Sequence, residues 1–220
     1  MFEVRRYRDS DEAAMREICM RTGAAGGDAR AMYRDQDLLP DIFAIPYAVL
    51  EPEFAFVADD DGRAVGYIVG TPDTPRFVER FREQWLPRVA HLHISPTGEV
   101  DLDADPDGSM ATVLHNPQWM LEPGLAAYPA HLHIDLLPQA QGKGAGRALM
   151  TTFLAALNAA GADAVHLGMG TSNTRARAFY DRLGFTELRL PDQPAGLTYL
   201  VRPTAQDGGN ASISRNSGQG

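Results

Sequence analysis

Hydrophobic positions along the chain recur in two spacings, one typical of strands and one typical of helices, and together they predict a mixed α/β fold. Residues 54–58 and 64–70 have strand character. The Asp-Asp-Asp-Gly turn between them tolerates positive φ, so the two segments are expected to form a hairpin. Further strands are predicted at residues 2–7, 131–137, 164–169, 186–190 and 197–202.

Helical spacing predicts helices before, between and after these strands. Ser10 is the expected N-cap of the first helix. A second, irregular helix is expected over residues 38–50, with a break near Pro46. Thr74 is the expected cap of a third, because Pro75 follows it at the first helical position. Two more helices are predicted, one that follows the segment Gln141–Gly146 and runs to Ala160, and one from Ser172 or Asn173 to Gly184.

Residues 71–130 differ from the rest of the chain, since they hold 8 of its 15 prolines. Their clearest helix has an apolar stripe that has nothing within the segment to pack on. We therefore expect an ordered insertion within one domain spanning residues 1–202, and not a second domain. Residues 203–220 are rich in glycine and serine and are expected to form a polar tail.

Composition excludes several classes of protein. The net charge of −9 is opposite in sign to that of a typical nucleic-acid-binding module. No apolar run approaches the ~20 residues of a membrane span. Cys19 is the one cysteine, which excludes an intramolecular disulfide, and the first residues lack the apolar segment of a signal peptide. We expect a cytoplasmic protein without nucleic-acid or membrane partners, and leave a homodimer open.

The strongest chemical signal is a glycine-rich turn at residues 141–146, between the strand 131–137 and the helix that runs to Ala160. A helix start offers unpaired N–H groups and the positive end of the helix dipole, and glycines let a phosphate approach closely. The turn is therefore suited to a phosphorylated cofactor. A P-loop is absent, and a dinucleotide fingerprint is only partly matched, because Arg147 occupies its third glycine position.

Two motifs in order resemble the GNAT acetyltransferases. Gln141-x-x-Gly144-x-Gly146 matches the family's [R/Q]-x-x-G-x-[G/A] motif, and residues 173–185 match N-x-x-A-x-x-[F/L]-Y-x-x-x-G-F. The segment 131–138 also resembles bacterial acetyltransferases that are similar to the acetyltransferase-like domain of O-GlcNAcase. The resemblance implies a central, mostly antiparallel sheet in which strands 131–137 and 164–169 splay apart.

The resemblance also implies acetyl-CoA as co-substrate. Its pantetheine arm would pair with backbone groups of the strand that ends at Pro138, and its pyrophosphate would lie on the N–H groups of the glycine-rich turn. Lys143 and Arg147 would add positive charge, and Asn173 would contact the arm while capping its helix. The implied cofactor-binding residues are Leu136, Leu137, Gln141, Gly142, Lys143, Gly144, Ala145, Gly146, Arg147, Asn173 and Tyr180.

The implied reaction is direct transfer of the acetyl group to a primary amine on a small molecule or peptide. Tyr180 aligns with the tyrosine that protonates the departing thiolate. For the base we favour Asp135, with His133 and His131 as alternatives, because strand alternation places all three on one face.

Two other functions remain open on the residues alone. One is a non-catalytic acyl-CoA-binding module, which the O-GlcNAcase resemblance allows, and the other is a nucleotide-binding oxidoreductase. No metal is expected. The acidic residues 103–107 match the opening of a calcium loop, but its twelfth position, which needs a glutamate, is Leu114.

Overall fold

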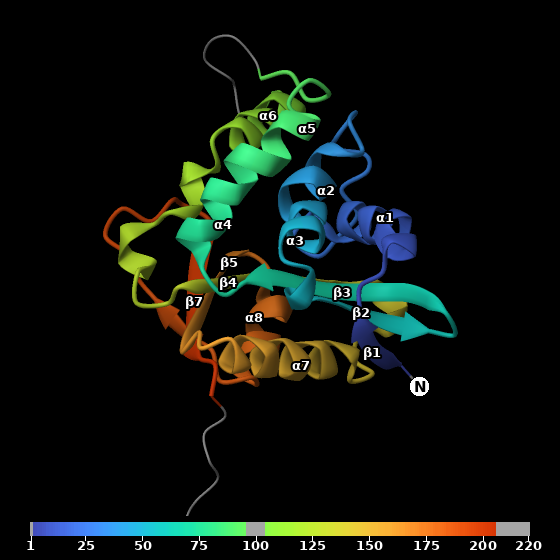
Figure 1. The fold of residues 1–220 in the computed structure, drawn as a ribbon, viewed down its shortest axis with the longest axis vertical. Helices are drawn as coiled ribbons and strands as arrows, with labels where there is room; N and C mark the ends of the chain where they lie inside the picture. The colour runs from blue at the N-terminus through green and yellow to red at the C-terminus, as the bar shows by residue number, and fades with distance from the viewer. Residues whose placement is uncertain (1, 96–103, 206–220) are drawn as a thin grey trace, which may run out of the picture.

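The computed structural model describes residues 2–95 and 104–205, and a seven-stranded sheet runs through their centre (Figure 1). Its strand order is β1-β2-β3-β4-β5-β7-β6, and neighbouring strands are antiparallel except for the parallel pair β4 and β5. The predicted mixed, mostly antiparallel sheet is confirmed. The strands are β1 (Glu3–Arg6), β2 (Ala55–Asp60), β3 (Arg63–Thr71), β4 (Ala130–Leu136), β5 (Ala164–Gly170), β6 (Thr186–Leu188) and β7 (Leu197–Pro203).

Helices cover both faces of this sheet. In Figure 1, α1, α2 and α3 lie above the sheet together with α4, α5 and α6, while α7 and α8 lie below it. The buried apolar side chains of both layers form one connected cluster. The helices are α1 (Glu12–Thr22), α2 (Leu38–Phe43), α3 (Ile45–Leu50), α4 (Thr74–Arg80), α5 (Leu86–Val89), α6 (Pro106–His115), α7 (Ala145–Ala159) and α8 (Thr174–Asp181).

The β2–β3 hairpin and the centre of the sheet depend on glycine at two positions. Asp61 and Gly62 both have positive φ, as the turn chemistry predicts. Gly70 on β3 is needed for a different reason, because a Cβ there would lie 2.1 Å from the carbonyl oxygen of His131 on β4. Without that glycine, β3 and β4 would not approach at their present spacing.

β4 and β5 separate soon after they meet. Only Ala130 and His131 of β4 pair with β5, although β4 continues to Leu136 and β5 to Gly170. The splayed arrangement that the family resemblance implies is therefore present, and the two strands diverge towards the N-terminal end of α7.

Two of the predicted helix caps are wrong. α1 begins at Glu12 after a 3-10 turn, so Ser10 does not cap it. The cap of α4 is Asp73, whose side chain accepts a hydrogen bond from the N–H of Arg76. Thr74 is instead the first helical residue, and its hydroxyl is held by tertiary contacts. The predicted break near Pro46 is present, at Ala44 between α2 and α3.

The insertion packs on the rest of the molecule through α4 and α5, which a π-helical turn joins. Phe77 of α4 stacks on Tyr47 of α3 with ring centroids 4.3 Å apart. His93 lies beyond α5 and is hydrogen-bonded to Asp35 and to buried Asp41. These contacts tie the segment to α2 and α3 and explain how its apolar stripe becomes buried.

The C-terminal end of the described chain is more ordered than the sequence predicts. β7 runs to Pro203, and Thr204 is buried with its N–H bonded to the carbonyl of Asp163. The predicted polar tail therefore begins no earlier than residue 205, and residues 206–220 lie outside the described part.

Candidate active site

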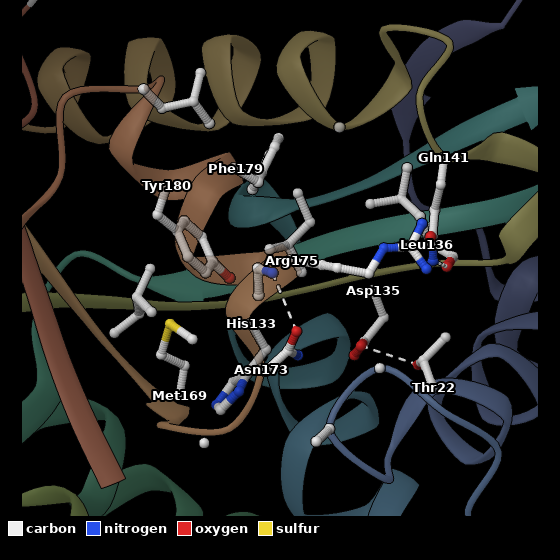
Figure 2. A pocket seen from close by; sticks show the side chains of 18 of the residues that line it. Thr22, His133, Asp135, Leu136, Gln141, Met169, Asn173, Arg175, Phe179 and Tyr180 are labelled. Carbon is white, nitrogen blue, oxygen red and sulfur yellow. Dashed lines mark hydrogen bonds between the residues drawn. The ribbon is translucent and has the colours of Figure 1, made fainter.

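A cleft of about 970 Å³ occupies the gap between the splayed strands (Figure 2). Residues 132–136 of β4 line one wall and residues 167–170 of β5 line the other. The rest of the lining comes mainly from the loop 24–27, which follows α1, from the glycine-rich turn, and from α8 and the residues after it to Leu183. The cleft therefore draws on segments from both ends of the chain.

The glycine-rich turn lies at one end of the cleft. Gly142 and Gly144 have φ values of 72° and 90°, and a Cβ on either would meet nothing within 4 Å. Directly after them α7 begins at Ala145, so the N–H groups of its first turn have no partner within the helix. Gly146 lies against the ring of Phe179 on α8. Open backbone at a helix N-terminus is the chemistry that a phosphate requires, so this end of the cleft is suited to a phosphate group.

The edge of β4 that faces the cleft is set by its pairing with β3. The N–H of Leu137 donates to the carbonyl of Val65, so Leu137 has its backbone directed at the neighbouring strand and does not line the cleft. Since direction alternates along a strand, the backbone groups of Ile134 and Leu136 lie on the cleft side. The carbonyl of Leu136 accepts a hydrogen bond of 2.9 Å from the Gln141 side chain.

The predicted cofactor residues divide into those that line the cleft and those that do not. Three are not part of the lining: Leu137 and Ala145, which are buried, and Lys143, which is exposed on the turn. Two arginines of the lining, Arg175 and Arg182, were not predicted. The predicted residues that do line it are Leu136, Gln141, Gly142, Gly144, Gly146, Arg147, Asn173 and Tyr180.

Asp135 projects from β4 into the middle of the cleft, where two hydroxyls hold its carboxyl group. Tyr67 donates to Oδ2 at 2.6 Å, and Oγ1 of Thr22, 2.9 Å from Oδ1, shares its one proton between that oxygen and the carbonyl oxygen of Ile18 at 2.7 Å. Burial raises the pKa of Asp135 above its ordinary value, although the two hydroxyl bonds oppose part of that rise. A carboxylate with a raised pKa is better able to accept a proton. Neither hydroxyl partner was predicted.

Tyr180 faces the cleft from α8, and Figure 2 shows its hydroxyl and the Asp135 carboxyl pointing into the cleft from opposite sides. The ring packs beside Phe179 and Phe185, with centroids 5.3 and 5.4 Å away. Burial, and next the charge of Asp135, raise the pKa of Tyr180. The phenol is therefore protonated at neutral pH and has a proton to give.

Asn173 is the N-cap of α8. Its side-chain oxygen accepts a hydrogen bond of 3.0 Å from the N–H of Ala176, shown as a dashed line in Figure 2. Its amide nitrogen lies 3.4 Å from where a Cβ on Gly26 would be, so the loop 24–27 closes against it. The cap is thus present, and its amide is also at the cleft.

Neither a membrane span nor a metal centre is found in the described residues. No helix within 2–95 and 104–205 is long and apolar enough to cross a bilayer. Over the same ranges, no three His, Cys, Asp or Glu side chains are grouped to bind a metal ion. Asp103, the first residue of the calcium-loop match, lies outside the described residues.

Comparison with known proteins decides the family. Residues 109–185 match the model of the acetyltransferase (GNAT) family. The crystal structure of a protein named SsHAT is 53% identical in sequence, with a TM-score of 0.88 over 93% of this chain and 99% of its own. The chain belongs to the GNAT acetyltransferase family. The motifs of the glycine-rich turn and of α8 both lie in the matched region.

Two further matches are more distant. Protein O-GlcNAcase from Rattus norvegicus is 23% identical over 203 residues, which are 92% of this chain. The chain spans only 22% of that curated relative's length. The structure of yncA from Salmonella typhimurium with acetyl-CoA has the same fold at 16% identity, with a TM-score of 0.54 over 94% of this chain and 95% of its own.

Proposed function

We propose that this GNAT protein transfers the acetyl group of acetyl-CoA directly to a primary amine. One observation carries the proposal: a single cleft has a helix N-terminus suited to phosphate at one end and a buried carboxyl group opposite a protonated phenol in its middle. Family membership favours this reaction over the nucleotide-binding oxidoreductase that the glycine-rich turn alone left open.

Acetyl-CoA would supply a thioester, whose carbonyl carbon is open to attack and whose thiolate is a fair leaving group. In the proposal the pyrophosphate lies on the N–H groups of Gly144 to Arg147, with Arg147 adding charge. The pantetheine arm follows the cleft-side backbone of β4. Asn173 and Gln141 orient that arm and the strand beside it. The structure of yncA, which shares the fold, was solved with acetyl-CoA, and this supports acetyl-CoA as the co-substrate.

The side chains in the middle of the cleft would carry the proton transfers. Asp135 takes the proton that the attacking amine loses, and Thr22 and Tyr67 hold its carboxyl group in place. Backbone N–H groups on the cleft side of β4 polarise the acetyl oxygen. Tyr180 gives its proton to the sulfur as the carbon–sulfur bond breaks. The net charge of −9 favours acceptors that arrive as cations.

A second candidate function is acyl-CoA binding without catalysis. The observation that favours it is the alignment of nearly the whole chain with a small part of O-GlcNAcase. Both functions predict acetyl-CoA binding, but only the first predicts turnover. The two are therefore separable in a single set of assays.

The test combines calorimetry with thiol release. Acetyl-CoA at 100 times its Kd adds about 2.7 kcal/mol to the free energy of unfolding, which raises Tm by several degrees. NAD at the same concentration serves as the control for the oxidoreductase. Release of free CoA that depends on an added primary amine supports the transferase. Tight binding without release for any of a panel of amines supports the binding module instead.

We also propose that the part of the chain before the polar tail, through residue 204, acts as one domain in the cytoplasm. Limited proteolysis checks the domain assignment, because a single domain gives no stable fragment that ends within 71–130.

A further inference from the structure

A chain of hydrogen-bonded side chains runs from the insertion to the cleft. Oγ1 of Thr74 lies 2.7 Å from Nδ1 of His131, and Nε2 of His131 lies 2.8 Å from Oη of Tyr47. The same Oη lies 3.1 Å from Nε2 of His133. Thr74, His131 and Tyr47 are buried, whereas His133 lines the cleft. This series of hydrogen bonds connects α4 and α3 with β4, the strand that carries Asp135.

The direction of these hydrogen bonds is fixed at the Thr74 end. Oγ1 of Thr74 lies 2.7 Å from the carbonyl oxygen of Pro129, which can only accept a hydrogen bond. The single hydroxyl proton of Thr74 therefore points to Pro129. Oγ1 must then accept from His131, so Nδ1 of His131 carries a proton.

His131 has no second ring proton. Aromatic rings surround it, with the centroids of Tyr47 and Phe77 at 5.4 and 5.6 Å, and no carboxylate of the described residues pairs with it. Burial lowers the pKa of His131 well below its ordinary value, so the ring is neutral and Nε2 holds a lone pair. A nitrogen without a proton can only accept, and Oη of Tyr47 lies 2.8 Å from this one, so the Tyr47 hydroxyl donates its single proton to His131.

The same argument passes from Tyr47 to His133. Since the Tyr47 proton points to His131, its oxygen accepts from His133, and Nε2 of His133 carries a proton. Burial lowers the pKa of His133 to about 4, so this ring is also neutral at pH 7. Its remaining nitrogen, Nδ1, then holds a lone pair, and no described residue donates to it. Phe43 packs on the ring with centroids 5.5 Å apart and limits its rotation.

We propose that Thr74, His131 and Tyr47 are positioning residues that hold His133 in its Nε2–H tautomer, and that the Nδ1 lone pair of His133 accepts a hydrogen bond from the acceptor amine. This inference rests on the proposed acetyl transfer. Asp135 lies two residues further along the same face of β4, so one amine nitrogen can meet both side chains.

The two side chains would have different roles. An imidazolium with a pKa of about 4 does not retain a proton at pH 7, so His133 orients the amine and stays neutral. The amine nitrogen forms its bond to the acetyl carbon as the carbon–sulfur bond breaks. One amine proton goes to Asp135, and the Tyr180 proton goes to sulfur. The second proton stays on the amine nitrogen and keeps its hydrogen bond to Nδ1 of His133. Such a site selects primary amines over secondary amines, which have only one N–H and leave Nδ1 unpaired.

The first test reads the tautomer directly. Nitrogen NMR of the full chain labelled at its six histidines is expected to show His133 with Nε2 protonated and Nδ1 bare at pH 7. His133→Gln assigns the signals. Thr74→Val removes the hydroxyl that fixes the direction of the hydrogen bonds and is expected to give mixed tautomers at His133. Thr74→Ser keeps the hydroxyl and is expected to keep the wild-type spectrum. Tyr47→Phe removes a different link of the hydrogen-bond network and replaces Thr74→Val if that variant does not fold. A wild-type His133 protonated on Nδ1 overturns the inference.

The second test reads acetyl transfer with n-butylamine and N-methylbutylamine as probes. Loss of one hydrogen bond to the amine corresponds to about a tenfold fall in kcat/KM. Thr74→Val is expected to show that fall for n-butylamine and a smaller one for N-methylbutylamine, with unchanged Kd for acetyl-CoA, while Thr74→Ser restores the wild-type ratio. If Thr74→Val changes the tautomer of His133 but leaves the ratio of kcat/KM for the two amines unchanged, this inference is overturned and the proposed function is not. A wild-type protein that binds acetyl-CoA but acetylates neither probe overturns the proposed function and this inference with it.

Discussion

Gly144 offers a test of phosphate binding in which charge is separated from shape. It stands directly before α7 with φ of 90°, and a side chain there would meet nothing within 4 Å. Asp and Asn both tolerate positive φ better than other residues that carry a side chain, and they are nearly identical in shape. Gly144→Asp and Gly144→Asn should therefore fold equally well and differ only in a negative charge at the proposed pyrophosphate site.

The expected difference follows from Coulomb's law. Two unit charges 4 Å apart interact by about 1 kcal/mol in water and by about 4 kcal/mol at an effective dielectric constant of 20. Because Gly144 is exposed, water screens a charge there, and we take about 1–2 kcal/mol for the repulsion between the introduced carboxylate and the phosphate. This energy corresponds to a change of roughly 5- to 30-fold in Kd. Gly144→Asp should bind acetyl-CoA more weakly than Gly144→Asn by that factor.

Calorimetric titration of both variants with acetyl-CoA, at low and at high salt, measures the difference. Added salt screens an exposed charge, so the gap between the variants should narrow as ionic strength rises. Equal affinities for the two variants at low salt would refute the reasoning. The turn would then be a structural connection and not a phosphate site.

Three other predictions address the site and the sheet. Tyr180→Phe should lower kcat for amine acetylation by ~10- to 1,000-fold and leave the Kd for acetyl-CoA nearly unchanged, and a wild-type rate would make Tyr180 a packing residue. The pKa of His133 is lowered on folding from 6.5 to about 4, so its contribution to stability is complete above pH 6.5 and is lost as the pH falls towards 4. The free energy of unfolding in urea should therefore fall by up to about 3 kcal/mol more for the wild type than for His133→Gln between pH 6.5 and pH 4. Equal falls for the two proteins would contradict the lowered pKa of His133. Gly70→Ala should lower the free energy of unfolding by about 3 kcal/mol, because its Cβ meets the His131 carbonyl, while Gly170→Ala, with open space around it, should not.

Local chemistry explains what was predictable from the sequence. The glycine-rich turn and the Asn173 cap depend on neighbours within a few residues, so their patterns identify them before any fold is known. The role of Asp135 was also predictable, because strand alternation places its side chain on one face together with His131 and His133. Leu137 was not, since its backbone direction depends on which residue of β3 pairs with it, and that register is tertiary information.

The same reasoning explains the residues that were missed. Thr22 and Tyr67 reach Asp135 from α1 and β3, far away in the chain, and no motif joins them. Arg175 was known only as a variable position inside a motif. Thr74 was placed as a cap because threonine is a good cap, but Asp73 takes that role and leaves the Thr74 hydroxyl for Pro129 and His131. In each case a contact between distant segments, which the sequence does not encode locally, decides the role.

The most direct test of the central claim is the stoichiometry of a single reaction. Protein, acetyl-CoA and a panel of primary amines are incubated together, and mass spectrometry measures both free CoA and acetylated amine. The account predicts equal amounts of the two products with the wild-type protein, and loss of both with Asp135→Asn, which still binds acetyl-CoA. Bound acetyl-CoA that yields no acetylated amine from any member of the panel would contradict it.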